Sequence, residues 1–231
     1  MEVTLIVATI IIISYILGSF PTAVVISKKF FGFDIREKGS GNMGSTNAFR
    51  ILGWKWGLAV QIIDVLKGVL AVVVVANVIG DGLDLGSHTW FEDSTLIRLI
   101  AGVSAVAGHI WSCFVGFRGG KGINTAAGML IGIAPIDVSI ALAIFLLALI
   151  FSGYVSLGSI MAAITVPSSM FLRYNVLNDS IPGYHIMIIF FSALSLLLVF
   201  THRKNVVRIL KGTENKFSKL QLIKFNKRNS S

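Results

Sequence analysis

The sequence predicts an all-α integral membrane protein with about seven transmembrane helices, its amino terminus outside and its carboxyl terminus in the cytoplasm. Three observations favour this fold class. Of the 231 residues, 55% are hydrophobic and 13% are charged, whereas soluble domains carry about 25% charged residues. Several uncharged apolar runs are long enough to cross a hydrocarbon core of about 30 Å. Lys and Arg gather in alternate loops, as expected for a polytopic membrane protein.

The first apolar run, from Val3 to Ile26, contains no charged residue and is long enough to span the bilayer. A cleaved signal peptide is the alternative interpretation. However, Glu2 stands where a signal peptide carries basic residues, and no small-residue cleavage site follows. We therefore expect a retained first helix.

The later apolar runs predict six more helices. Residues 138–172 carry no charge and are too long for one crossing, so we expect a break around Gly153–Gly158. Residues 123–136 form a short run bounded by Pro135 and Asp137. The expected segments are Trp56–Ile79, Leu96–Phe117, the short Ile123–Ile136, Val138–Phe151, Tyr154–Leu172 and Ile181–Thr201.

Charge in the loops fixes the predicted topology. The first loop, the third loop and the tail are basic, whereas the second loop begins with acidic residues. Counting residues 123–136 as a separate crossing places every basic segment in the cytoplasm. The net charge of +9 therefore indicates a membrane surface and no nucleic acid. We expect one membrane domain over residues 1–215 and a basic tail over 216–231, lying on the inner leaflet or solvated.

The first polar cluster runs from Asp34 to Arg50. Gly39, Gly41 and Gly44 form a literal G-x-G-x-x-G pattern, but a dinucleotide site needs a strand–helix–strand unit that is missing here. Glycines mixed with small polar residues let backbone N–H groups converge on an anion, and Arg50 can hold phosphate oxygens. A flexible linker is the alternative. The cluster favours a phosphate site.

A second cluster, Phe117–Gly122, contains Gly-Gly-Lys-Gly at the start of the short helix. It is not a Walker A motif, because Lys121 is followed by glycine. It is a candidate second phosphate site. Just before it lies His109, inside a predicted helix, either as a functional residue or as a structural one bonded to a neighbouring helix.

Two further groups of polar residues complete the pattern. Asp64 and Lys67 are three residues apart on one helix, so they can neutralise each other and either line a polar cavity or link helices. Near the carboxyl terminus, His202 and Asn205 would share a face if the last helix continues. The alternative for His202 is an anchor at the membrane interface.

These clusters, in this order, resemble the bacterial acyl-phosphate:glycerol-3-phosphate acyltransferases over nearly the whole chain. Three positions depart from the family pattern: Ser45 and Asn124 each stand where alanine is usual, and Ser112 stands where proline is common. The motifs are Gly18-Ser19, Asp34-Ile-Arg36, Gly39–Asn47, Asp64 with Lys67-Gly68, Gly108-His109, Phe117–Gly122, Tyr154-Val-Ser156, His202-Arg-x-Asn205 and Gly212-Thr-Glu214.

The resemblance implies transfer of a fatty acyl group from acyl phosphate to glycerol 3-phosphate, giving 1-acyl-glycerol 3-phosphate and phosphate. It implies no metal and no cofactor. The implied location is the inner membrane of a bacterial cell, with the lipid bilayer as surroundings. A monomer is compatible with the sequence.

We expect the acyl phosphate group in the loop around residues 41–47, and the glycerol phosphate near the cations. The predicted catalytic residues are Ser40, Arg50, His109, Lys121, His202 and Asn205. The predicted substrate-binding residues are Gly41, Asn42, Gly44, Ser45, Thr46, Asn47, Gly119, Gly120, Gly122, Ser156 and Glu214.

The proton of the attacking hydroxyl has three candidate acceptors: an oxygen of the leaving phosphate, His109 and His202. We favour the phosphate. A covalent intermediate on Ser40 is disfavoured, because acyl phosphate is already activated and no Ser-His-Asp order is visible. A transporter is the competing class, but transporters show repeats and access from both sides. A membrane scaffold would leave the polar clusters unexplained.

Overall fold

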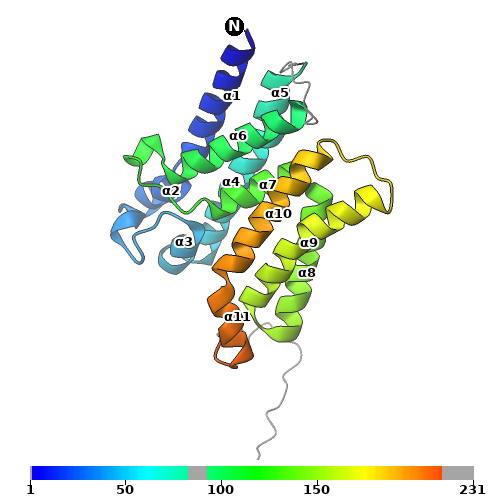
Figure 1. Cartoon of the computed structure of the whole chain (residues 1–231). Coiled ribbons are helices and arrows are strands. Elements are labelled where there is room, and N and C mark those ends of the chain that lie inside the picture. The colour runs from blue at the N-terminus through cyan, green and yellow to red at the C-terminus, as the bar shows by residue number, and fades with distance from the viewer. Residues whose placement is uncertain (1, 83–92, 215–231) are drawn as a thin grey trace, which may run out of the picture. The chain divides into compact units, whose positions relative to one another are not determined.

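The computed structural model describes residues 2–82 and 93–214, which form helices, turns and no strand (Figure 1). The predicted all-α class is confirmed. The chain forms two compact units, Met1–Pro135 and Ile136–Ser231. The α-helices are α1 (Glu2–Ser19), α2 (Thr22–Phe31), α3 (Ser45–Ile51), α4 (Trp54–Leu70), α5 (Ala76–Gly80), α6 (Asp93–Ile110), α7 (Ile123–Ile133), α8 (Pro135–Ser152), α9 (Val155–Asn175), α10 (Tyr184–Thr201) and α11 (Arg203–Leu210).

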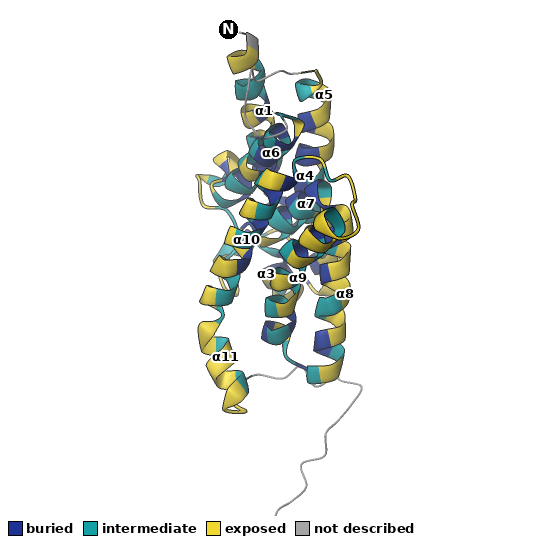
Figure 2. Ribbon diagram, turned by 45° about the vertical axis from the view of Figure 1, so that its right-hand side comes forward, coloured by how far each residue is buried: buried dark blue, intermediate teal, exposed yellow. Residues whose placement is uncertain are grey.

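Within the described residues, six helical stretches are long and apolar enough to cross a membrane. Helix α7 is apolar but shorter, with 11 residues. The seventh crossing and the orientation of the termini therefore stay predictions. Figure 2 shows exposed residues along the outer faces of the long helices, and they include large apolar side chains such as Ile12, Leu66, Leu142 and Leu196. Such apolar faces are suited to lipid. The predicted tail 216–231 and most of the acidic second loop lie outside the described residues.

The first span differs from the single helix predicted over residues 3–26. Helix α1 ends at Ser19 and α2 begins at Thr22, so the span breaks at Phe20 and Pro21. Proline has no backbone N–H and cannot continue the hydrogen-bond ladder. The carbonyls freed at the break accept side-chain donors: Ser19 O from Ser112 Oγ, and Phe20 O from Lys67 Nζ at 3.0 Å.

A second interruption lies between α6 and α7. Helix α6 ends at Ile110, and the backbone at Ser112 is extended with ψ 120° before a short 3₁₀ turn, Cys113–Val115 (η3). The bend therefore forms without the proline common in the resembled family. The hydroxyl bond from Ser112 to the α1 carbonyl holds it in place.

Glycines bring the helices of the first unit into close contact. Helix α1 packs along α6, and α4 packs along α7. A Cβ at Gly18 would meet the Ala105 backbone, and one at Gly108 would meet the Tyr15 carbonyl. Gly68 and Gly128 make the equivalent contacts between α4 and α7. Small residues permit this backbone approach, which drives helix association in membranes.

In the second unit, α9 packs against α10. The predicted break is confirmed at Gly153, which has φ +76° between α8 and α9. A nearly buried ion pair of 2.8 Å joins Asp137 at the start of α8 to Arg173 in α9, and the Ser169 hydroxyl also donates to Asp137. Tyr174 and Tyr184 stack at 3.7 Å between ring centroids.

Replacing Gly108 by alanine should destabilise the first unit, because the new methyl group would overlap the Tyr15 carbonyl and push α1 from α6. We expect a loss of about 1–3 kcal/mol, as for other overpacked sites. Denaturant unfolding in detergent measures it. Gly80→Ala is the comparison and should lose less, because the atoms nearest to its Cβ belong to the side chains of Ile97 and Ile10, which can shift more easily than a backbone carbonyl. Equal stability of Gly108→Ala and wild type would contradict the packing argument.

Candidate functional site

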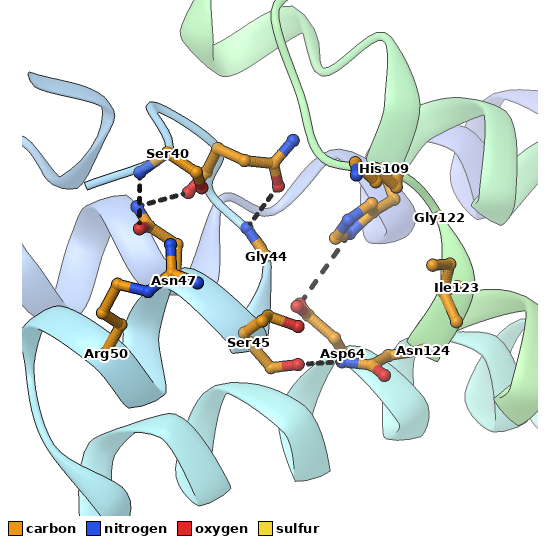
Figure 3. Close-up of a pocket in the computed structure, with 13 residues that line it drawn as sticks. Ser40, Gly44, Ser45, Asn47, Arg50, Asp64, His109, Gly122, Ile123 and Asn124 are labelled. Atoms are coloured by element: carbon orange, nitrogen blue, oxygen red, sulfur yellow. Dashed lines mark hydrogen bonds and ion pairs between the residues drawn. The ribbon is translucent and has the colours of Figure 1, made fainter. Parts of the chain in front are cut away.

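A cavity of about 300 Å³ in the first unit collects most of the site residues predicted there (Figure 3). The cavity opens among the loop before α3, helices α3, α4 and α6, and the start of α7. Among its lining residues, Asp64, Ile123 and Asn124 were not in the predicted site. The lining residues are Ser40, Asn42, Gly44, Ser45, Thr46, Asn47, Arg50, Asp64, His109, Lys121, Gly122, Ile123 and Asn124.

Asn47 holds the first loop in shape. Its side chain is buried, its Oδ1 accepts from Ser40 N at 3.0 Å, and its amide nitrogen donates to carbonyls on both sides of the turn. Those carbonyls belong to Ile35, Lys38 and Asn42. Gly39 and Gly41 supply the left-handed backbone that the turn needs, with φ +63° and +70°.

The loop itself uses several of the N–H groups that were expected to meet an anion. Ser40 N donates to Asn47, Gly41 N to the Lys38 carbonyl, and Gly44 N to Asn42 Oδ1 at 2.8 Å. Ser45 and Thr46 begin α3, where first-turn N–H groups have no acceptor within the helix. Within the described residues these two N–H groups have no hydrogen-bond partner, so they can donate to an anion in the cavity.

Arg50 and Lys121 bring positive charge to the cavity. Both side chains are exposed and line it, and neither forms an ion pair with a carboxylate of the described residues. By contrast, Arg36 and Lys28 are paired: they lie 2.8 Å and 3.3 Å from Asp34 Oδ2. The hydrogen bond from Arg36, followed by that from Lys28, holds the pKa of the Asp34 carboxyl well below its usual range, and Asp34 in turn raises the pKa of Arg36.

Among the described residues that line this cavity, Asp64 is the one carboxylate, and its charge is already balanced. Asp64 Oδ1 accepts from Lys67 Nζ at 2.8 Å and from Thr22 Oγ1 at 2.9 Å. Both charged side chains are almost fully buried, with 2% and 4% exposure. The predicted neutral pair is confirmed, and it both borders the cavity and links helices.

Ser45 and Asn124, two of the departures from the resembled family, bond to each other. Asn124 Nδ2 donates to Ser45 Oγ at 2.9 Å, joining the first turn of α3 to the first turn of α7 (Figure 3). Asn124 was not among the predicted site residues. The sequence did carry a signal: both Ser45 and Asn124 are polar residues at positions where the resembled family usually has alanine.

The second glycine cluster is tied to the end of α6. Gly119 N donates to the Ile110 carbonyl and Gly120 N to the His109 carbonyl, both at 3.0 Å. A Cβ at Gly119 would meet the His109 carbonyl. Gly119 and Gly41 line a separate recess of about 390 Å³ beside Arg36 and Arg118, not the cavity of Figure 3.

The other predicted residues lie in the second unit. Glu214 Oε1 accepts from Ser156 Oγ at 2.9 Å and from Asn205 Nδ2 at 2.8 Å, and Arg208 Nε lies 2.6 Å from its other oxygen. The bonds from Arg208 and Asn205 lower the pKa of Glu214 to about 2. The helix does not continue through His202, where α10 ends and α11 begins.

The comparisons with known proteins identify the family. The family model described as glycerol-3-phosphate acyltransferase matches residues 8–212. The glycerol-3-phosphate acyltransferases of Chlorobaculum tepidum and Chlorobium limicola are each 44% identical to this chain, covering 90% of it and 95% and 94% of their own lengths.

Two solved structures of PlsY, an integral membrane glycerol 3-phosphate acyltransferase, are also similar. One is a glycerol 3-phosphate form and the other a lysophosphatidic acid form, each with a TM-score of 0.63 and 32% identity. The alignments cover 93% of this chain and 96% and 97% of those chains. The matches to family, relatives and structures thus span nearly all of the chain, and it belongs to the glycerol-3-phosphate acyltransferase family of integral membrane acyltransferases.

Proposed function

We propose that this acyltransferase moves a fatty acyl group from acyl phosphate to glycerol 3-phosphate, forming 1-acyl-glycerol 3-phosphate and phosphate. One observation carries the proposal. The cavity joins two unpaired cations, Arg50 and Lys121, to the free first-turn N–H groups of α3, while its one carboxylate is neutralised by Lys67. Such a site favours a phosphate group.

The similar structures support glycerol 3-phosphate as the acceptor and lysophosphatidic acid as the product. A similar structure was solved in a glycerol 3-phosphate form and another in a lysophosphatidic acid form. We also propose acyl phosphate as the acyl donor. Unlike acyl-CoA, it needs an anion site and an apolar groove but no nucleotide site. We place the reaction at the cytoplasmic face of a bacterial inner membrane, where the predicted basic loops lie.

The reaction needs no protein nucleophile. The acceptor hydroxyl attacks the acyl carbonyl carbon, a new ester C–O bond forms, the bond from that carbon to the phosphate oxygen breaks, and a base takes the hydroxyl proton. Arg50 and Lys121 would hold the phosphate groups and stabilise the negative charge of the transition state. Ser40 as a covalent nucleophile stays disfavoured, because no base within the described residues is bonded to its hydroxyl.

Three of the predicted site residues are linked by hydrogen bonds within the second unit. Glu214 holds the Ser156 hydroxyl and the Asn205 amide by hydrogen bonds. We propose that Glu214 orients Ser156 and Asn205, rather than contacting the anionic substrate itself. The predicted roles of His202 and Asn205 in holding glycerol phosphate stay predictions.

The deciding experiment supplies purified protein in lipid nanodiscs with glycerol 3-phosphate and either acyl phosphate or acyl-CoA. We expect lysophosphatidate and phosphate to appear in equal amounts with acyl phosphate, and no product with acyl-CoA. Turnover with acyl-CoA alone would overturn the donor. Absence of turnover with both would overturn the proposed reaction.

Removing either free cation should weaken the reaction. Arg50→Ala and Lys121→Ala should each lower kcat/KM by roughly 10- to 150-fold, because each loses a charge-assisted hydrogen bond. Steady-state phosphate release measures this. Lys55→Ala is the matched control: Lys55 is exposed at the start of α4, lies over the Trp54 ring and does not line the cavity. Wild-type rates in the two cavity variants would contradict the assignment.

The Ser45–Asn124 bond should act as one unit. Ser45→Ala and Asn124→Ala should each lower kcat/KM by up to about tenfold, as for loss of a neutral hydrogen bond. The double variant should be no worse than either single variant, because both remove the same bond. Additive losses in this cycle would show that the two residues act separately.

The Glu214 carboxyl should titrate far below its usual pKa. Because the folded pKa is about 2 and the ordinary value is 4.5, the stability it adds is present above pH 4.5 and disappears as the pH falls through 2. Carbon-13 NMR of labelled glutamate, assigned with Glu214→Gln, should give a midpoint near 2 that Arg208→Gln raises. A wild-type midpoint near 4.5 would contradict the observed pairing.

A further inference from the structure

The environment of His109 fixes which of its ring nitrogens carries the proton. The ring is 3% exposed, and Nδ1 lies 3.1 Å from Lys67 Nζ. An ammonium group has three hydrogens to donate and no lone pair to accept with. If Lys67 is charged, Nδ1 must therefore accept the bond, and the neutral ring carries its proton on Nε2.

The contacts of Lys67 Nζ favour a charged ammonium group. Its Nζ has three acceptors, one for each ammonium hydrogen: Asp64 Oδ1 at 2.8 Å, Phe20 O at 3.0 Å and His109 Nδ1 at 3.1 Å. A neutral lysine would leave the Asp64 carboxylate buried with its charge unbalanced, which costs several kcal/mol. The three acceptors come from three different parts of the unit.

Lys67 bonds to both Asp64 and His109. Asp64 Oδ1 and His109 Nδ1 themselves are 3.9 Å apart, within the range of an ion pair (dashed line in Figure 3) but too far for a hydrogen bond. A carboxylate bonded directly to Nδ1–H would leave a lone pair on Nε2, and the histidine could then act as a base. Here Lys67 Nζ bonds to both groups instead, so Nδ1 accepts a hydrogen bond and Nε2 carries the proton.

We infer that His109 is a hydrogen-bond donor through Nε2–H to an anionic oxygen of the substrate, and that Lys67 is the positioning residue that holds it in this tautomer. The inference rests on the proposed function, since it assigns a role within the same cavity. It removes His109 from the candidates for the general base.

Gly120 carries no side chain that would block Nε2. A Cβ at residue 120 would meet His109 Nε2, whereas the glycine places only backbone beside it. Nε2 forms no hydrogen bond with the described residues, and His109 lines the cavity. The donor therefore has no protein partner to give up when an anion enters.

In neutral His202 the proton and the lone pair lie on the opposite ring nitrogens from those in His109. Its Nδ1 lies 2.9 Å from the Leu198 carbonyl, which can only accept, so Nδ1 carries the proton and Nε2 keeps its lone pair. The candidates for the base are then His202 and the leaving phosphate oxygen. The two histidines predicted as catalytic would have different chemical roles.

Three substitutions at His109 separate a donor from a base. The amide nitrogen of glutamine reaches about as far as Nε2 and can donate, asparagine reaches only the δ position, and alanine does neither. His109→Ala and His109→Asn should lower kcat/KM by roughly 10²–10³-fold, the cost of removing a donor to a developing oxyanion. His109→Gln should lose less than about tenfold. Equal losses in all three variants would overturn the donor role.

Nitrogen-15 NMR of histidine-labelled protein reads the tautomer directly. His109 is assigned by the signal that disappears in His109→Gln. At neutral pH we expect a protonated Nε2 and an unprotonated Nδ1. A protonated Nδ1, or a doubly protonated ring, would overturn the inference.

Lys67→Met tests the positioning role, with Lys55→Met as the control on the same helix. The loss of the ammonium should let Asp64 attract a proton to Nδ1, so the NMR signal should switch to the Nδ1–H tautomer and kcat/KM should fall. The control should change neither. An unchanged His109 tautomer in a folded Lys67→Met protein would contradict the role of Lys67.

The outcomes separate this inference from the proposed function. If wild type makes lysophosphatidate but His109→Gln is as inactive as His109→Ala, the inference fails and the function stands. If wild type makes no product, the proposed function fails, while the NMR signal still reports the tautomer.

Discussion

The Lys67 ammonium group is the constraint on which the first unit depends. A lysine buried among apolar helices must be fully bonded, because no water is available to solvate it. Its three partners lie on α4, on α6 and at the break between α1 and α2. Pro21 ends the hydrogen-bond ladder of α1, and Lys67 then bonds the Phe20 carbonyl at the break and holds His109 against α4.

This network forms where glycines let the helix backbones touch. Reciprocal contacts through Gly18 and Gly108 draw α1 to α6, and Gly68 and Gly128 draw α4 to α7. Two loops line the cavity: one runs from α2 to α3 and the other from α6 to α7. Asn47 then fixes the first loop, Arg36 reaches across to the Val115 carbonyl at 3.0 Å, and the Ser45–Asn124 bond joins α3 to α7. The cavity is thus assembled on a rigid support, as positioning catalysis requires.

Hydropathy and charge predicted the helical class, the break near Gly153 and the clustering of polar residues, because each depends on local composition. The Asp64–Lys67 pair was predictable from its spacing of three residues. The break at Pro21 was missed because an uncharged run does not show whether its backbone bonds are satisfied within one helix. Asn47 was predicted as a ligand, yet its bonds lie within the loop. Only the three-dimensional position of Ser40, Ile35 and Lys38 shows this.

The most direct measurement is a crystal structure with a non-hydrolysable acyl phosphonate, an analogue of the proposed donor. We expect the phosphonate in the cavity, bonded to the first-turn N–H groups at Ser45 and Thr46, within reach of Arg50 or Lys121, and with the acyl chain directed between apolar helices. A phosphonate bound outside this cavity, with the cavity still free of ligand, would contradict the assignment of this cavity as the phosphate-binding site.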